Sequence, residues 1–236
     1  MLPRQNFESR WTENFDKLSW SAPAKFQMNR HLDMDDRVRA KRAELAGNPE
    51  ISPVGRQNAI RKFIADEIAP DVRRGRKAVE AMSAKIAARR ARIQPPPPDK
   101  NDAAGAILRS EYRQMLRQMS NGERVAFLMQ NDDPVMAAAA LEVPPRVLNL
   151  PNEVRQHLIN TEIERSHPGA LAALDDAEEM ATLVKSTFDY AVNTTRNAVD
   201  MPEHAFTNFI DGSTGNKAAA IDQNVTSVFS SFADAA

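Results

Sequence analysis

Residues 173–199, ALDDAEEMATLVKSTFDYAVNTTRNAV, decide the fold that this sequence predicts. Apolar and small side chains recur in this stretch at alternating spacings of three and four residues, which places them along one edge of an α-helix. The small residues among them allow a partner helix to approach closely. We therefore predict a long helix over residues 167–199. Its seam contains Leu174, Ala181, Val184 and Phe188.

A second long helix is predicted over residues 71–93, DVRRGRKAVEAMSAKIAARRARI. Its apolar seam contains Val79, Met82 and Ile86 at heptad spacing, whereas Gly75 and Arg89 fill the remaining seam positions poorly. Because each helix has only a narrow apolar edge, we expect the two to pair, either within one chain or between subunits.

The charge of the chain is divided between its two halves. Residues 1–100 hold 21 Lys and Arg against 13 Asp and Glu, a net charge of +8, whereas residues 101–236 hold 10 against 19, a net charge of −9. This division predicts either that the halves neutralise each other by packing together, or that two surfaces have different partners. In the second case the basic face of residues 56–94 contacts either nucleic acid or an acidic protein surface. The candidate phosphate contacts are Arg73, Arg74, Arg76, Lys77, Arg89, Arg90 and Arg92.

Aromatic side chains gather near the N-terminus. Phe7, Trp11, Phe15 and Leu18 are spaced by four, four and three residues, which predicts one stripe of a helix, and Trp20 follows shortly after. Two interpretations remain open. The stripe either closes the core of the protein itself, or forms an arm that docks on a partner, since Trp and Phe anchor many interfaces.

Helix-start and helix-stop signals divide the rest of the chain. Asp33 and its acidic neighbours predict the start of a charged helix over residues 33–46, and Ser52 followed by Pro53 predicts another helix start. Pro70 predicts a break or kink, and the four prolines at 95–98 predict a stiff polyproline spacer. The predicted parts are an N-terminal arm (1–52), a basic helical hairpin (53–94), a polyproline linker (95–101), a helical subdomain ending in the long helix (102–200) and a weakly ordered tail (201–236).

Strand patterns are nearly absent, so the predicted fold is all-α: an elongated helical bundle with two long heptad-patterned helices and a cluster of short, proline-punctuated helices.

The sequence contains no assembled set of catalytic residues. It has no Cys, which excludes disulfide scaffolds and cysteine nucleophiles, and its four His are scattered without metal-binding spacing. We therefore expect no metal, no cofactor and no enzymatic activity. No apolar run approaches the ~20 residues of a membrane helix, and the N-terminus has no apolar signal segment, so we expect a protein made in a cytoplasm and not bound to membrane.

Several segments carry a resemblance to known proteins. They are GRQNAIRKFIADEIAP (55–70), RSEYRQMLRQM (109–119), ERVAFLM (123–129) and PPRVLNLPNEVR (144–155), together with the long Arg/Ala-rich helix and its proline break. As a composite, residues 55–199 resemble uncharacterised helix-rich proteins encoded in tailed bacteriophages and prophages.

The resemblance implies a role in the virion or in its assembly. The expected function is a non-enzymatic structural or assembly protein, made in the host cytoplasm and located in the virion. It would act through helix packing and through docking of its terminal segments on portal, capsid or neck components, and we expect it to be a homo-oligomer. The alternative is a nucleic-acid-binding helical module that uses the basic face of residues 56–94.

Overall fold

The computed structural model describes residues 3–97, 99 and 101–231, and every regular element in them is a helix. The predicted all-α class is therefore confirmed. Contacts divide the chain into two compact units: Met1–Arg89 with Asp175–Ala236 forms unit 1, and Arg90–Leu174 forms unit 2. Unit 2 is thus inserted in sequence between two segments of unit 1.

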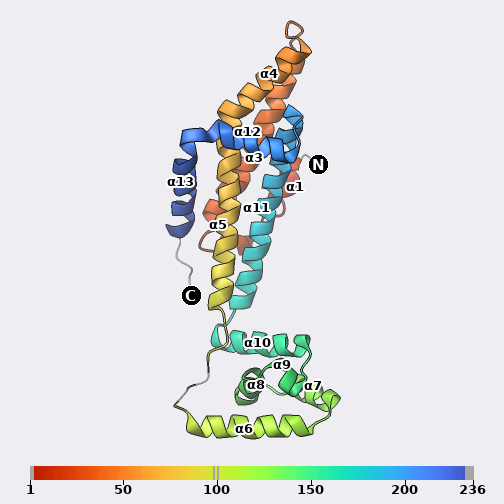
Figure 1. Ribbon diagram of the computed structural model, residues 1–236, viewed down its shortest axis with the longest axis vertical. Helices are drawn as coiled ribbons and strands as arrows, with labels where there is room; N and C mark the ends of the chain where they lie inside the picture. The colour runs from red at the N-terminus through yellow and green to blue at the C-terminus, as the bar shows by residue number, and fades with distance from the viewer. Residues whose placement is uncertain (1–2, 98, 100, 232–236) are drawn as a thin grey trace. The chain divides into compact units, whose positions relative to one another are not determined.

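Three long helices form the body of unit 1. They are α3 (Ser21–Ala46), α5 (Ala69–Arg92) and α11 (Ala170–Val199), and they lie side by side in Figure 1. Helices α5 and α11 are the two long helices that the sequence predicts, and they pack within one chain. The sequence analysis did not find their third partner. It predicted a helix only over residues 33–46, whereas α3 begins at Ser21, so Asp33 and Asp36 lie in the middle of a helix and not at its start.

The three long helices meet most closely at Gly75 of α5. A Cβ atom added to Gly75 would lie 2.5 Å from Cδ2 of Phe188 on α11 and 2.7 Å from Nε2 of His31 on α3. The ring centroids of His31 and Phe188 are 5.2 Å apart. Gly75, a poor seam residue by the sequence analysis, is therefore the residue that makes room for both neighbouring helices.

His31 is enclosed at this junction, with 1% of its surface exposed. The hydroxyl of Thr187 donates to the carbonyl of Val184 at 2.7 Å, so its oxygen is free to accept from Nδ1 of His31, 3.3 Å away. This arrangement leaves Nε2 facing α5 without a hydrogen-bond partner among the described residues. The imidazole is therefore held as a neutral ring.

The remaining core of unit 1 joins these helices to α4 (Pro53–Phe63) and α12 (Glu203–Thr214). Ser52 caps α4 by accepting from the backbone N–H of Gly55 at 3.1 Å, as the sequence predicts. The chain passes from α4 to α5 through a π-helical turn, Ile64–Ile68, just before Pro70. Because proline lacks an N–H group, it is tolerated where the regular helical bonding pattern is already altered.

The N-terminal segment is not the single aromatic helix that the sequence predicts. It contains two short helices, α1 (Pro3–Glu8) and α2 (Glu13–Asp16). Thr12 has an extended backbone with φ −103° and ψ 159°, which interrupts the helix between them. Phe7 and Phe15 therefore lie on different helices, and the predicted common stripe does not form.

The C-terminal segment has more structure than the weakly ordered tail that the sequence predicts. After α12 and the short turn η2 (Gly215–Lys217), helix α13 spans Ala218–Ser231 and buries Ile221, Val225 and Phe229. These side chains recur every four residues, so a single helical face is anchored. Residues 232–236, which belong to the predicted tail, lie outside the described residues.

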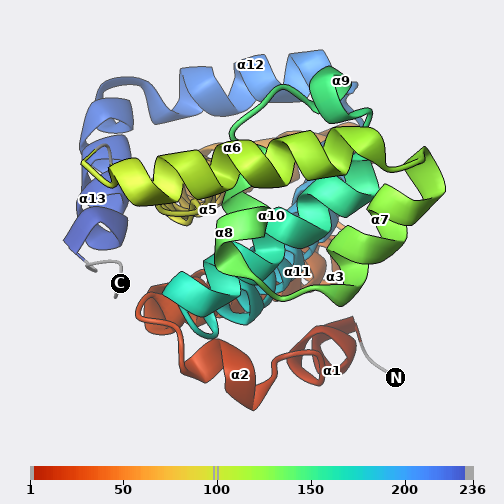
Figure 2. The same ribbon diagram turned by 90° about the horizontal axis from the view of Figure 1, so that it is seen from below.

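Unit 2 is a compact set of short helices around its own core. They are α6 (Ala103–Gln118), α7 (Asn121–Gln130), α8 (Pro134–Leu141), α9 (Pro145–Leu148) and α10 (Asn152–Ser166). Helix α8 contacts both α6 and α10 (Figure 1), and α7 turns back beside α10 (Figure 2). Two aspartates cap helices of this unit: Asp102 accepts from the backbone N–H of Gly105 at 2.8 Å, and Asp133 accepts from that of Val135 at 2.8 Å.

A buried arginine ties together the loops of unit 2. Arg124, 8% exposed, donates from Nε to the carbonyl of Leu116 at 2.6 Å, from Nη2 to that of Met119 at 2.8 Å, and from Nη1 to that of Leu148. These are carbonyl groups at the ends of α6 and α9, which have no partner within their own helices. The Arg124 side chain thereby supplies hydrogen bonds to carbonyl groups that the helices themselves leave without a donor.

The described part of the proline run packs within unit 2. Pro95, Pro96 and Pro97 line a cavity of about 270 Å³ together with residues of α8 and α10, including Leu141 and Ile159. Pro98 and Lys100, which belong to the predicted linker, lie outside the described residues.

Substituting Gly75 tests the packing of the three helices. Gly75→Ala should lower the free energy of unfolding by about 1–3 kcal/mol, because the new methyl group overlaps Phe188 and His31. The matched control is Gly212→Ala in α12, where an added Cβ meets nothing within 4 Å. That change should raise stability by about 0.5–1 kcal/mol through helix propensity alone. Urea unfolding followed by circular dichroism measures both, and equal effects of the two changes would contradict the packing described.

The buried imidazole predicts a specific pH dependence of stability. Burial lowers the pKa of His31 from 6.5 to about 4, and this outweighs the opposing attraction of Asp71 and Asp189. The native state therefore binds the proton less tightly than the unfolded chain. The contribution of His31 is complete above pH 6.5 and is lost as the pH falls towards 4, at a cost of about 3 kcal/mol.

His31→Gln keeps a polar side chain without this titration. As the pH falls from about 6.5 towards 4, the unaltered protein should lose unfolding free energy relative to His31→Gln, and above that range the two curves should be parallel. Identical pH dependence in both proteins would mean that His31 is not buried as described.

Candidate interaction site

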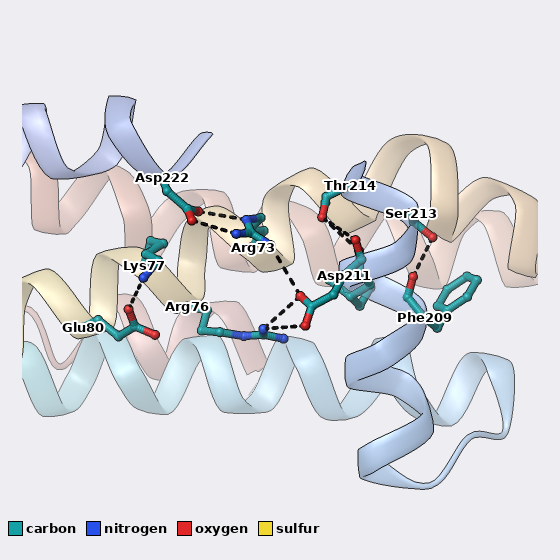
Figure 3. A network of polar contacts seen from close by, with 10 residues as sticks. Arg73, Arg76, Lys77, Glu80, Phe209, Asp211, Ser213, Thr214 and Asp222 are labelled. Atoms are coloured by element: carbon teal, nitrogen blue, oxygen red, sulfur yellow. Dashed lines mark hydrogen bonds and ion pairs between the residues drawn. The ribbon is translucent and has the colours of Figure 1, made fainter. Parts of the chain in front are cut away.

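The basic face of α5 holds the C-terminal helices against the body of unit 1 (Figure 3). Arg73 donates to Asp222 of α13 through two parallel hydrogen bonds, from Nε to Oδ1 at 2.8 Å and from Nη2 to Oδ2 at 2.7 Å. Arg76 donates from Nη1 to Oδ1 of Asp211 on α12 at 3.1 Å. We call these four residues, Arg73, Arg76, Asp211 and Asp222, the charged clasp.

The clasp stabilises the charged form of its members. The hydrogen bond from Arg73 lowers the pKa of Asp222 below its usual 3.8, and the same bond raises the pKa of Arg73. Nη1 of Arg73 also lies 3.6 Å from Oδ1 of Asp211, so this guanidinium bridges both C-terminal helices. The clasp therefore remains charged at neutral pH.

A second cluster joins α3 to α5 through one buried carboxylate. Asp71 is 6% exposed and accepts hydrogen bonds from three arginines: Arg30 at 2.6 and 2.9 Å, Arg37 at 3.0 Å and Arg74 at 2.8 Å. Arg30 and Arg37 lie on α3, two turns apart, so Asp71 fixes the position of α3 along α5. A carboxylate bonded by three guanidinium groups can be buried without a large desolvation cost.

The structure therefore occupies most of the candidate phosphate contacts with carboxylates of the chain itself. Arg73 and Arg76 belong to the clasp, Arg74 contacts Asp71, and Lys77 contacts Glu80 at 2.6 Å. Arg89 is half-buried, and Arg90 and Arg92 are exposed near the end of α5. The clasp joins the basic and acidic halves of the sequence, which supports internal neutralisation. Contact of these residues with nucleic acid stays a prediction.

The candidate docking residues all contact the chain itself. Phe15, Leu18 and Trp20 are buried, and the ring of Trp20 lies 6.4 Å from that of Phe229 in α13. Trp11 packs edge-on against Phe15 with centroids 5.5 Å apart, and its Nε1 donates to Asp16 at 2.9 Å. The aromatic segment was expected either to close the chain's own core or to dock on a partner. Phe15, Leu18 and Trp20 lie in the chain's own core. Phe7 alone lies on α1.

Helix α1 packs on α3 and α11, and Arg4 and Phe7 are among the side chains that make the contact. Arg4 donates from Nη2 to Asp33 at 2.6 Å and to Asp36 at 2.8 Å, both on α3. The ring of Phe7 lies 5.5 Å from that of Tyr190 on α11. We call Asp33, Asp36 and Tyr190 the α1 receptor. Sequence reasoning found Phe7 but missed Arg4 and its partners, because their pairing spans about thirty residues and leaves no local pattern.

The predicted seam residues lie between the long helices with unequal burial. Met82, Leu174 and Val184 are buried, whereas Val79, Ile86, Ala181 and Phe188 are half-buried. The sequence analysis missed Ala78 of α5 and Thr187 of α11, which are fully buried. Both follow the face that turns towards α3, which an analysis of two helices alone does not include.

The described residues contain no group of three or more His, Asp or Glu arranged to hold a metal ion. No helix in the described part of the chain is both long and apolar enough to span a membrane. Comparison of the chain with protein-family models, with curated proteins and with solved structures gives no match.

A double-mutant cycle measures the strength of the clasp. Arg73→Gln and Asp222→Asn should show a coupling energy of about 1 kcal/mol, because the two hydrogen bonds are charged and parallel but solvent still screens the pair. The matched control is the Lys41–Glu44 pair within α3, which should couple more weakly because it joins no second helix. Equal coupling in the two cycles would show that the clasp does not hold α13.

Proposed function

We propose that this protein is a non-enzymatic structural or assembly protein of a tailed-phage particle, which joins neighbouring subunits by docking its N-terminal segment. The observation that supports this most is the way in which α1 rests on the α1 receptor.

Helix α1 depends on the surface that receives it. It has six residues, and none of them is buried. An isolated helix of this length is unstable in water, because the entropy lost in forming its first turn exceeds the stabilisation from its few hydrogen bonds. The Arg4 fork and the Phe7 ring are among its contacts with α3 and α11, and Asp33 and Asp36 keep 64% and 58% of their side chains exposed. Helix α1 can therefore leave the receptor at small cost.

The receptor is fixed independently of α1. Asp33 and Asp36 lie one turn apart in the middle of α3, and the hydroxyl of Tyr190 accepts from Nη2 of Arg39 at 2.7 Å. Two carboxylates beside an aromatic ring offer a complementary site for an Arg and a Phe three residues apart on a helix. An identical segment from a neighbouring copy fits the same receptor, which is the geometry of segment exchange in homo-oligomers.

The connection to phage particles rests on the resemblance of residues 55–199. On the basis of this resemblance we propose portal, capsid or neck proteins as its neighbours in the particle. An exchanged N-terminal segment suits this role, because a short segment can link subunits without altering the cores that they bring to the assembly.

Removal of residues 1–9 tests the proposal without touching the core. The truncated protein keeps Phe15, Leu18 and Trp20, so its helical circular dichroism and its melting temperature should change little. Its self-association, measured by light scattering after size exclusion, and its abundance in purified particles, measured by mass spectrometry, should both fall at least about tenfold.

Receptor variants provide the reciprocal test. Asp33→Asn combined with Asp36→Asn should reproduce the loss, whereas Asp66→Asn, an exposed acid on the π-helical turn, should not. Full incorporation of the truncated protein into particles would refute the proposed docking role.

A further inference from the structure

We propose that a groove of unit 1, lined by α5, α11 and α12, binds a small amphipathic monocarboxylate. The groove encloses about 370 Å³, which lies within the range of small-molecule sites and is too small for a docked helix. It lies apart from the α1 receptor and serves no part of the docking function proposed above, so this inference goes beyond that function.

The floor of the groove is apolar. It is formed by Val72 of α5, by Phe188 and Val192 of α11, and by Phe206 of α12. Val72 and Phe206 are almost fully buried, with 1% and 3% of their surface exposed, so they belong to the rigid core of unit 1. The apolar surface that remains open to water belongs to Phe188 and Val192, which are half-buried, and an aliphatic chain or a ring laid there covers it.

Arg196 supplies a positive charge at the groove, and its ion-pair partner Glu203 is distant and exposed. Its side chain is 29% exposed, yet among the described residues no acceptor lies within hydrogen-bond distance of its guanidinium group. The carboxylate of Glu203 is 3.9 Å away and 89% exposed. A guanidinium group presents five N–H donors in a planar fork that matches a carboxylate.

The other charges at the groove are already balanced. Arg76 is bound by Asp211 in the clasp, and Asp189 is bound by Lys185 at 2.5 Å. Glu203 extends into solvent and can turn away at little cost. One cation is therefore available beside an apolar floor, and the ligand that fits has one anionic group on a short apolar body.

Octanoate is a suitable probe, and calorimetric titration of the full chain measures its binding. Octanoate should bind, whereas octylamine, with the opposite charge on the same chain, should not. Arg196→Gln should weaken binding about tenfold or more by removing the fork. Glu203→Gln should strengthen binding by several fold, because the competing carboxylate is lost. Val192→Phe should abolish binding by filling the floor while leaving every charge in place.

Controls separate recognition from general stickiness and from misfolding. Arg61→Gln, an exposed arginine of α4 outside the groove, should bind octanoate as the unaltered chain does. The circular dichroism of each variant verifies its fold. Unchanged affinity in Arg196→Gln, or binding of octanol as tight as that of octanoate, would overturn the proposal. Opposite effects of the Arg196 and Glu203 substitutions in folded proteins would establish it.

Discussion

The close approach of three helices at Gly75 is the constraint on which unit 1 depends. The absence of a side chain there lets the Phe188 ring and the His31 imidazole enter the same space. Helices α3 and α11 thereby reach α5 at one level, and the apolar residues above and below that level come into contact. A larger residue at this position separates all three helices at once, because packed cores transmit such strain instead of absorbing it locally.

Charged groups fix the positions of the helices along one another, which the thin apolar seams do not. Seams rich in Ala bury little area, and they permit neighbouring helices to slide along one another. Asp71 opposes this sliding between α3 and α5, because three arginines converge on it from fixed positions. The charged clasp does the same for α12 and α13. Ionic contacts of this kind contribute more to the choice of one arrangement than to net stability.

Local sequence signals predicted the helices well, because the interactions behind them span only a few residues. Ser52 caps the helix that the Ser-Pro signal predicts, and α5 and α11 end within a few residues of the predicted limits. The prediction of a single N-terminal helix was wrong because it rested on local spacing alone. Its aromatic spacing fits a helix, but burial of Phe15 and Trp20 in the core overrides that local preference.

Contacts between residues far apart in the chain could not be predicted from the sequence. The partners of Arg4, the three arginines on Asp71 and the pairing of Arg73 with Asp222 depend on which helices become neighbours. Net charge predicted that the halves of the chain attract, but no pattern in the sequence indicates which arginine meets which carboxylate. The role of Gly75 in the packing could not be predicted either, because a glycine within a helix is unfavourable unless a neighbouring helix comes too close for a side chain.

The most direct test of this account is the nuclear Overhauser effect between the α-protons of Gly75 and the rings of Phe188 and His31. The packing described predicts cross-peaks from Gly75 to both rings in the full chain at neutral pH. Cross-peaks to neither ring, in a protein whose helices are otherwise intact, would contradict the three-helix junction and the arrangement of unit 1 that is built on it.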